Sequence, residues 1–288
     1  TLEGLDVVQF PYEYILEKAW ATNKDDEAWV NALADRHVGS VSLPVREAWQ
    51  ILFNDIYVQV PKTAGILPTY RPKMGENSGR TKTNYSNKQL LLVWQNLLDA
   101  SDLRRDALRL DVISVGRQLL GNYFLTVKNE FDKMYQTKDL AALNMRASEM
   151  RELLVDIDKL TSYHDYTSLS KWISDARGLS KDPVIQDYYA KNARNLVTTW
   201  GGTLNDYASR AWSGLISDYY SIRWNMYIDA VLRAVESKTE FSQKALDDAI
   251  KQFEDHWVSS NKQVERKVEG DLMNYAHFLL NKYKTRLE

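Results

Sequence analysis

The sequence of 288 residues contains no cysteine, which excludes disulfide bridges and metal sites built from thiolates. It also has no apolar run near the roughly 20 residues that a membrane-spanning helix requires. The 37 Lys and Arg nearly balance the 39 Asp and Glu, and neither sign forms a long block. These absences predict no membrane span and no nucleic-acid partner. The lack of cysteine is compatible with export, because many exported bacterial proteins also lack it.

Residues that break helices are scarce as well. The chain has 12 Gly and 6 Pro, and five of the prolines lie at or before Pro72. Between Leu103 and Met134 apolar residues recur at spacings of three and four, which predicts one long amphipathic helix. Further helices are expected to start at Pro11 and Pro44 and to cover residues 25–39, 140–160, 168–179, 183–199, 241–261 and 269–286. The expected fold class is therefore all-α, a multi-helix bundle.

One segment lacks this helical pattern. Residues 58–87 contain three prolines and three glycines among scattered polar residues, which predicts a long loop. Loops of this length inside a domain are usually functional or disordered.

The stretch TTWGGTLNDY contains two glycines flanked by aromatic residues. Thr203 and Asp206 have the spacing of a capping box, which predicts a helix that starts at Thr203 with Leu204 and Tyr207 in its first turn. The apolar residues that follow, as far as Val235, form two stripes. A helix that is apolar on two faces is expected at the centre of its bundle.

This reading brings two aromatic residues to the same end of the bundle. Trp200 is expected where one helix ends, and Tyr207 where the next begins. An indole can pack against the apolar face of a pyranose and a phenol can bind a hydroxyl, so the two residues could line a sugar pocket. The alternative is that both rings fill a helix hairpin, because aromatic residues belong more often to a core than to a site.

Other residue types give little sign of chemistry. The four histidines lie far apart and have no metal-ligand spacing: His37, His164, His256 and His277. The sequence has no Gly-rich phosphate loop and no Gly-x-Ser-x-Gly motif. We therefore expect structural roles for the histidines, no metal site and no cofactor. Taken alone, Glu3 in TLEGLD carries no local mark of a catalytic residue.

Taken together, the two motifs resemble glycoside hydrolase family 89, the α-N-acetylglucosaminidases. The block NARNLVTTWGGTLNDYASRAWSGLISDYYSIRW is similar to a family block of the form Leu-Trp-Gly, Asp-Tyr-Ala, Gly-Leu, Tyr-Tyr and Arg-Trp. The segments WVNALADRHVG and REAWQILFNDIY also resemble the helices that precede this block in the family. The resemblance runs over nearly the whole chain and implies the C-terminal helical region of such an enzyme.

The resemblance also implies roles for particular residues. TLEGLD resembles the family's Glu-Gly segment at the end of a barrel strand, which implies that Glu3 is the catalytic nucleophile. Retaining glycosidases need a second carboxyl group about 5 to 5.5 Å away, and its family position lies upstream. Trp200, Leu204 and Tyr207 match positions that line the sugar pocket from the helical side.

The implied function is that of a C-terminal fragment of an exported retaining glycosidase, which removes terminal α-linked N-acetylglucosamine from glycans. Residues 1–10 would be a remnant of the catalytic (β/α)8 barrel, and residues 11–288 an all-α C-terminal domain. The implied partners are an N-acetylglucosamine-terminated glycan and the missing catalytic barrel of the same polypeptide, without which the fragment is expected to be inactive. Two alternatives stay open: a non-catalytic helical glycan-binding module of a sugar-uptake system, and a purely structural scaffold.

Overall fold

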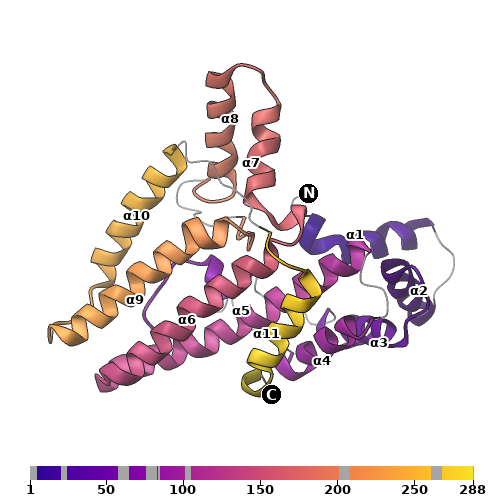
Figure 1. Ribbon diagram of the computed structural model, residues 1–288, viewed down its shortest axis with the longest axis horizontal. Helices are drawn as coiled ribbons and strands as arrows, with labels where there is room; N and C mark the ends of the chain where they lie inside the picture. Colours follow the sequence, from indigo (N-terminus) through magenta and orange to yellow (C-terminus); the bar gives the residue numbers. More distant parts are fainter. Residues whose placement is uncertain are drawn as a thin grey trace. The chain divides into compact units, whose positions relative to one another are not determined.

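The computed structural model describes residues 5–20, 25–57, 65–75, 83, 85–100, 105–200, 208–260 and 268–287 (Figure 1). In these ranges the regular elements are helices, and β pairing is limited to an isolated parallel bridge between Ser168 and Ser213. The prediction of an all-α fold is therefore confirmed. No helix of the described ranges is long and apolar enough to span a bilayer.

The chain divides into two compact units, of which the first comprises residues 1–60, 84–116 and 271–288. Its helices are α1 (Leu5–Trp20), α2 (Asp26–Val38), α3 (Leu43–Ile51), the π-helical turn η1 (Leu52–Ile56), α4 (Asn87–Leu98), the first part of α5 (Asp106–Thr137) and α11 (Leu272–Leu287). Helix α3 packs against α2 and α4, and α4 also packs against α11. Trp94 is fully buried in this unit and donates a hydrogen bond from Nε1 to the carbonyl oxygen of Val112 at 2.9 Å.

Helix α2 has the two ends that its sequence predicts. The Asp25 carboxylate accepts a hydrogen bond from the backbone N–H of Ala28 at 2.9 Å. Gly39 follows the last turn with φ of 85°, a left-handed conformation that glycine adopts without strain. Local cap chemistry therefore sets both ends of this helix.

Helix α1 begins earlier than the sequence indicates. It starts at Leu5 and contains Pro11 in its interior, so the prediction of a helix start at Pro11 is wrong. Phe10 stacks on Trp49 with ring centroids 5.5 Å apart, and this packing outweighs the tendency of a residue before proline to leave the helical region. The domain boundary predicted between residues 10 and 11 falls inside α1, and the two-domain division itself stays a prediction.

The second unit comprises residues 61–83 and 117–270. Its elements are the 3-10 turns η2 (Leu67–Thr69) and η3 (Asp165–Thr167), the rest of α5, α6 (Leu140–Thr161), α7 (Leu169–Gly178), α8 (Pro183–Leu196), the π-helical turn η5 (Ile216–Tyr220), α9 (Ser221–Glu236) and α10 (Gln243–Ser259). Helix α9 packs against α6 and α10, while α7 and α8 form a helical hairpin (Figure 1). The rings of Trp224 and Phe124, both fully buried, meet edge to face at 4.9 Å in the core of this unit.

Part of the predicted long loop is packed into the second unit. Within residues 65–75, Ile66 to Thr69 are buried. Trp224 donates from Nε1 to the carbonyl oxygen of Pro68 at 2.9 Å, and Arg223 donates from Nη2 to that of Thr69 at 3.2 Å. The side chains of α9 therefore satisfy backbone groups that a surface loop would leave to water. The neighbouring residues 58–64 and 76–82 lie outside the described ranges.

Candidate functional site

Trp200 lies just beyond the C-terminal end of α8, in a turn of the chain. Its backbone N–H donates to the carbonyl oxygen of Asn195 at 2.9 Å. Thr198 donates from its hydroxyl to the carbonyl oxygen of Arg194 at 2.7 Å, which fixes the same turn. The Trp200 side chain is 43% exposed. The structure therefore places part of the indole at the surface of the second unit.

The other three residues predicted for the site fall outside the described ranges. These residues are Glu3, Leu204 and Tyr207. The capping box of Thr203 and Asp206 also falls there. The roles predicted for all of them stay predictions.

Residues 208–214, which we call the returning segment, are not helical. Residues 208–214 have no helical turn, Ser209 has φ of 46°, and Gly214 has φ of 82°. The prediction of a helix that starts at Thr203 and continues as far as Val235 is therefore wrong for residues 208–214. Helical structure resumes with the π-helical turn η5, which leads into α9.

A contact remote in sequence explains the late helix start. The carboxylate of Asp158, on α6, accepts hydrogen bonds from the backbone N–H groups of Gly214 at 2.8 Å and Ser217 at 3.0 Å. It thus caps the helical stretch that begins after Gly214. Burial raises the pKa of Asp158, although these two hydrogen bonds act in the opposite direction. In the sequence, Gly214 is the local indication that a helix does not run through this position, because glycine is unfavourable inside a helix.

Ser213 is held in addition by backbone hydrogen bonds to the start of α7. Its N–H donates to the carbonyl oxygen of Thr167 at 2.8 Å, and its own carbonyl accepts from the N–H of Leu169 at 2.9 Å. This pair forms the isolated bridge between Ser168 and Ser213. The returning segment is therefore fixed to α6 and to the start of α7.

Two further tryptophans and an arginine lie on or beside the returning segment. Trp212 is buried, and its ring centroid is 5.9 Å from that of Trp172 on α7. Trp172 donates from Nε1 to the carbonyl oxygen of Ala193 on α8 at 2.9 Å, which joins the two helices of the hairpin. The guanidinium of Arg210 lies 5.8 Å from the Trp212 ring, within cation–π range. Sequence reasoning missed these residues, because no local pattern pairs Trp172 with Trp212.

Two of the four histidines, His37 and His164, make structural contacts. His37 Nδ1 is 2.6 Å from an Asp111 carboxylate oxygen, and the His37 ring meets the Trp49 ring edge-on at 5.2 Å. Burial disfavours protonation of His37, but the attraction and hydrogen bond of Asp111 raise its pKa above the usual range. His164 accepts the backbone N–H of Tyr166 at 3.1 Å and caps η3. In the part of the chain that is described, no cluster of three or more His, Asp or Glu could hold a metal ion.

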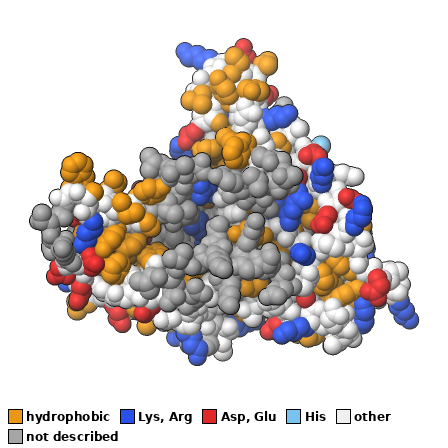
Figure 2. All heavy atoms as spheres, turned by 180° about the vertical axis from the view of Figure 1, so that it is seen from behind, with side chains coloured by type: hydrophobic (Ala, Val, Ile, Leu, Met, Phe, Trp, Pro, Cys, Tyr) orange, Lys and Arg blue, Asp and Glu red, His pale blue; other side chains and the backbone are white. Residues whose placement is uncertain are grey.

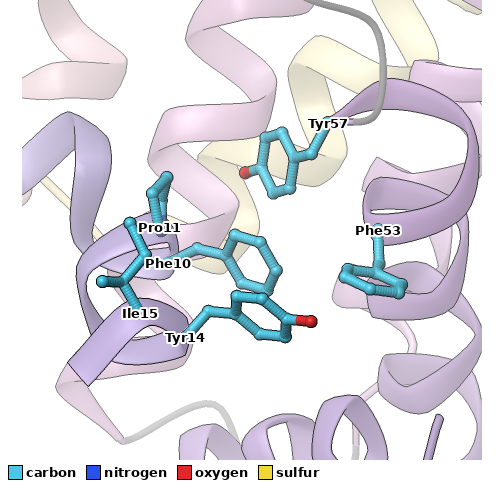
Figure 3. Close-up of a pocket in the computed structure, with 6 residues that line it drawn as sticks. All are labelled: Phe10, Pro11, Tyr14, Ile15, Phe53 and Tyr57. Atoms are coloured by element: carbon cyan, nitrogen blue, oxygen red, sulfur yellow. The ribbon is translucent and has the colours of Figure 1, made fainter. Parts of the chain in front are cut away.

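A separate pocket lies in the first unit (Figure 3). It has a volume of about 230 Å³ and is lined by Phe10, Pro11, Tyr14, Ile15, Phe53 and Tyr57. Phe10 stacks on Tyr57 and on Tyr14, with ring centroids 4.9 and 6.1 Å apart. The tyrosine hydroxyls are the only polar side-chain groups of these six residues. The lining therefore offers no acid–base group for neutral pH, and we assign no reaction to it.

A comparison with protein families identifies the domain. The family model described as "Alpha-N-acetylglucosaminidase (NAGLU) C-terminal domain" matches residues 29–282. The chain belongs to this family. The match includes Trp200 and the returning segment of the NAGLU C-terminal domain, and the family resemblance of the sequence is confirmed.

The relatives of this NAGLU C-terminal domain are longer proteins. Human alpha-N-acetylglucosaminidase is 26% identical over 296 aligned residues, which cover 99% of this chain and 39% of the human protein. A family 89 glycoside hydrolase from Clostridium perfringens, solved in complex with PUGNAc, has a TM-score of 0.84 and 23% identity, covering 94% of this chain and 33% of that one. CpGH89 from the same organism, solved with its substrate GlcNAc-alpha-1,4-galactose, has a TM-score of 0.85 and 22% identity, covering 96% and 34%. These structural matches establish the fold, and the chain spans well under half of each relative.

Proposed function

We propose that the protein containing this domain is a retaining α-N-acetylglucosaminidase, which removes terminal α-linked N-acetylglucosamine from glycans. In this proposal the domain forms one wall of the sugar pocket, and a catalytic barrel of the same polypeptide forms the other. The observation that carries the proposal is the family match over residues 29–282. The names of the human relative and of the complex with GlcNAc-alpha-1,4-galactose support the same chemistry. A match to a domain of an enzyme favours this function over a non-catalytic glycan-binding module.

The wall that we propose is centred on Trp200. Trp94 and Trp224 are fully buried, whereas the Trp200 indole is 43% exposed at the end of α8. An exposed indole can pack against the apolar C–H face of a pyranose ring. In the proposal Leu204 extends this apolar surface, and the phenol of Tyr207 binds a sugar hydroxyl.

Glu3 takes the role of nucleophile in the proposed reaction. Its carboxylate attacks the anomeric carbon while the glycosidic C–O bond breaks, and a second carboxyl group on the barrel protonates the leaving oxygen. The resulting glycosyl ester is hydrolysed by water, which the same second group deprotonates, so the product keeps the α configuration. This domain alone supplies one of the two carboxyl groups and is therefore expected to be inactive.

The first test compares variants of the full-length protein on an aryl α-N-acetylglucosaminide. Glu3→Gln should lower kcat by at least about 1,000-fold, because the amide cannot form the covalent intermediate. Trp200→Ala should lower kcat/KM about tenfold, the equivalent of one aromatic packing contact of about 1.4 kcal/mol. Tyr166→Ala is the control, because Tyr166 is an aromatic residue of the same unit that is 67% exposed. Full activity of Glu3→Gln, or an equal loss in Trp200→Ala and Tyr166→Ala, would refute the assignments.

Titration of this domain alone with N-acetylglucosamine separates the proposal from the binding-module alternative. One wall of a divided pocket should show no saturable binding in the millimolar range, whereas a self-sufficient module should bind the sugar and lose it on Trp200→Ala. Clear binding by the isolated domain would therefore favour the module.

A further inference from the structure

Helix α8 has apolar residues on two opposite faces. The inward face contains Ala190 and Ala193, which are buried. The outward face carries four apolar side chains between 41% and 77% exposed: Val184, Ile185, Tyr188 and Leu196. At 3.6 residues per turn the two sets lie on opposite sides of the helix.

The inward face already holds α8 in its unit. It packs against α7 and α10, and Trp172 donates its indole N–H to the carbonyl oxygen of Ala193 at 2.9 Å. On the outward face, Val184 and Tyr188 are 77% and 61% exposed. A helix that is apolar on both faces is normally packed on both.

The outward face belongs to a larger apolar surface of the hairpin. Leu179, between α7 and α8, is a further apolar residue of the hairpin and is 77% exposed. Figure 2 shows hydrophobic side chains gathered on the hairpin, at the top of the view. Asp187, on the same helix, is paired with Arg177 at 2.7 Å, so the charge on this part of α8 is balanced within the hairpin. Clustered apolar groups of this kind mark an interaction surface, whereas single exposed ones do not.

From this arrangement we infer that the outward face of α8, defined by Val184, Ile185, Tyr188 and Leu196, is the surface on which the catalytic domain of the same polypeptide docks. This inference rests on the proposed function. The matched relatives extend far beyond this domain, since it covers 39% of the human protein and 34% of CpGH89, and the family is by its description a C-terminal domain. The remainder of such a protein is long enough to supply a whole domain as the partner.

The position of Trp200 decides between this partner and a second copy of the chain. The outward face runs along α8 to Leu196, and Trp200 follows in the turn fixed by Asn195. A domain that supplies the other wall of the sugar pocket has to approach Trp200, and the adjoining face of α8 is then covered in the same contact. A second copy on this face would instead crowd the end of α8 where the sugar has to enter.

Thiol labelling of the full-length protein tests the inference, because this chain contains no cysteine of its own. Val184→Cys places a thiol on the outward face, and Val155→Cys places one on α6, where Val155 is 64% exposed. Each labelling rate with iodoacetamide is read on its own peptide by mass spectrometry and divided by the rate of the same peptide in urea. Val184→Cys should be slowed at least about tenfold, and Val155→Cys should stay within a few-fold of its urea rate.

The possible results test the docking surface on α8 independently of the proposed function. Labelling of Val184→Cys at nearly its urea rate overturns the inference, and slowing that appears only at high protein concentration also overturns it, because it indicates a second copy. If Val184→Cys does not fold, Tyr188→Cys decides by the same criteria. Turnover of the aryl glycoside is measured on the same samples. Slow labelling without turnover refutes the proposed function alone, and turnover with fast labelling refutes the docking surface alone.

Discussion

The buried ionic cluster of the second unit permits a sharp prediction for Glu254→Ala. Glu254, on α10, is 1% exposed and accepts a hydrogen bond from Arg223 Nη1 at 2.9 Å and another from Arg71. Removing one partner of a buried ion pair costs about 3–5 kcal/mol, because the remaining charge is left in a medium of low polarity. The Arg223 guanidinium also lies 4.8 Å from the Tyr219 ring, and this cation–π contact remains in the variant. We therefore expect a loss near the lower end of that range, about 3 kcal/mol in the free energy of unfolding.

The assay is urea unfolding of the domain, followed by tryptophan fluorescence and by far-UV circular dichroism. Asp248→Ala is the matched control: Asp248 is also on α10, but its ion pair with Lys244 at 2.6 Å joins side chains that are 61% and 86% exposed. That variant should show no measurable shift of the unfolding midpoint, because exposed pairs are screened by water and salt. A loss below about 1 kcal/mol in Glu254→Ala, or equal shifts in the two variants, would refute the reasoning.

Two further predictions concern the packing of the first unit and the returning segment of the candidate site. Gly116→Ala should destabilise the domain by about 1–3 kcal/mol in thermal unfolding, because the new Cβ would lie 2.6 Å from the buried Trp94 ring. Gly178→Ala is the control. Its Cβ would have no atom within 4 Å, so this variant should be neutral or slightly stabilising. Folding raises the pKa of Asp158, so its contribution to stability is complete below the unfolded pKa of about 3.9 and is lost as the pH rises through the folded pKa. Asp158→Asn keeps an oxygen that accepts from Gly214, and it should flatten this pH dependence of the unfolding free energy; an unchanged slope would contradict this account.

The sequence predicts an element well where its determinants are local. Asp25 and Gly39 fix the ends of α2 through contacts within a few residues, and the apolar repeat between Leu103 and Met134 is enough to predict most of α5. Pro11 shows the limit of such signals. A strong local breaker is overridden by the stacking of Phe10 on Trp49, which lies far along the chain.

The candidate site is harder to predict because remote residues shape it. The capping-box pattern of Thr203 and Asp206 predicts a helix start, but the carboxylate of Asp158 fixes the start observed after residues 208–214. Likewise, the prolines and glycines of residues 58–87 predict a loop but give no sign that its middle part is buried. That burial depends on donors from Arg223 and Trp224, more than 150 residues away in sequence.

Both irregular segments of the second unit depend on the same helical stretch. The turn η5 starts where Asp158 holds Gly214, and α9 follows it directly with Arg223 and Trp224, which hold residues 65–75. A close-packed core transmits a displacement of one element to its neighbours instead of absorbing it. A substitution in the buried face of α9 therefore acts on the returning segment beside Trp212 as well as on residues 65–75. The packing of the bundle therefore sets the position of the returning segment, which follows the candidate sugar-binding residues in the chain.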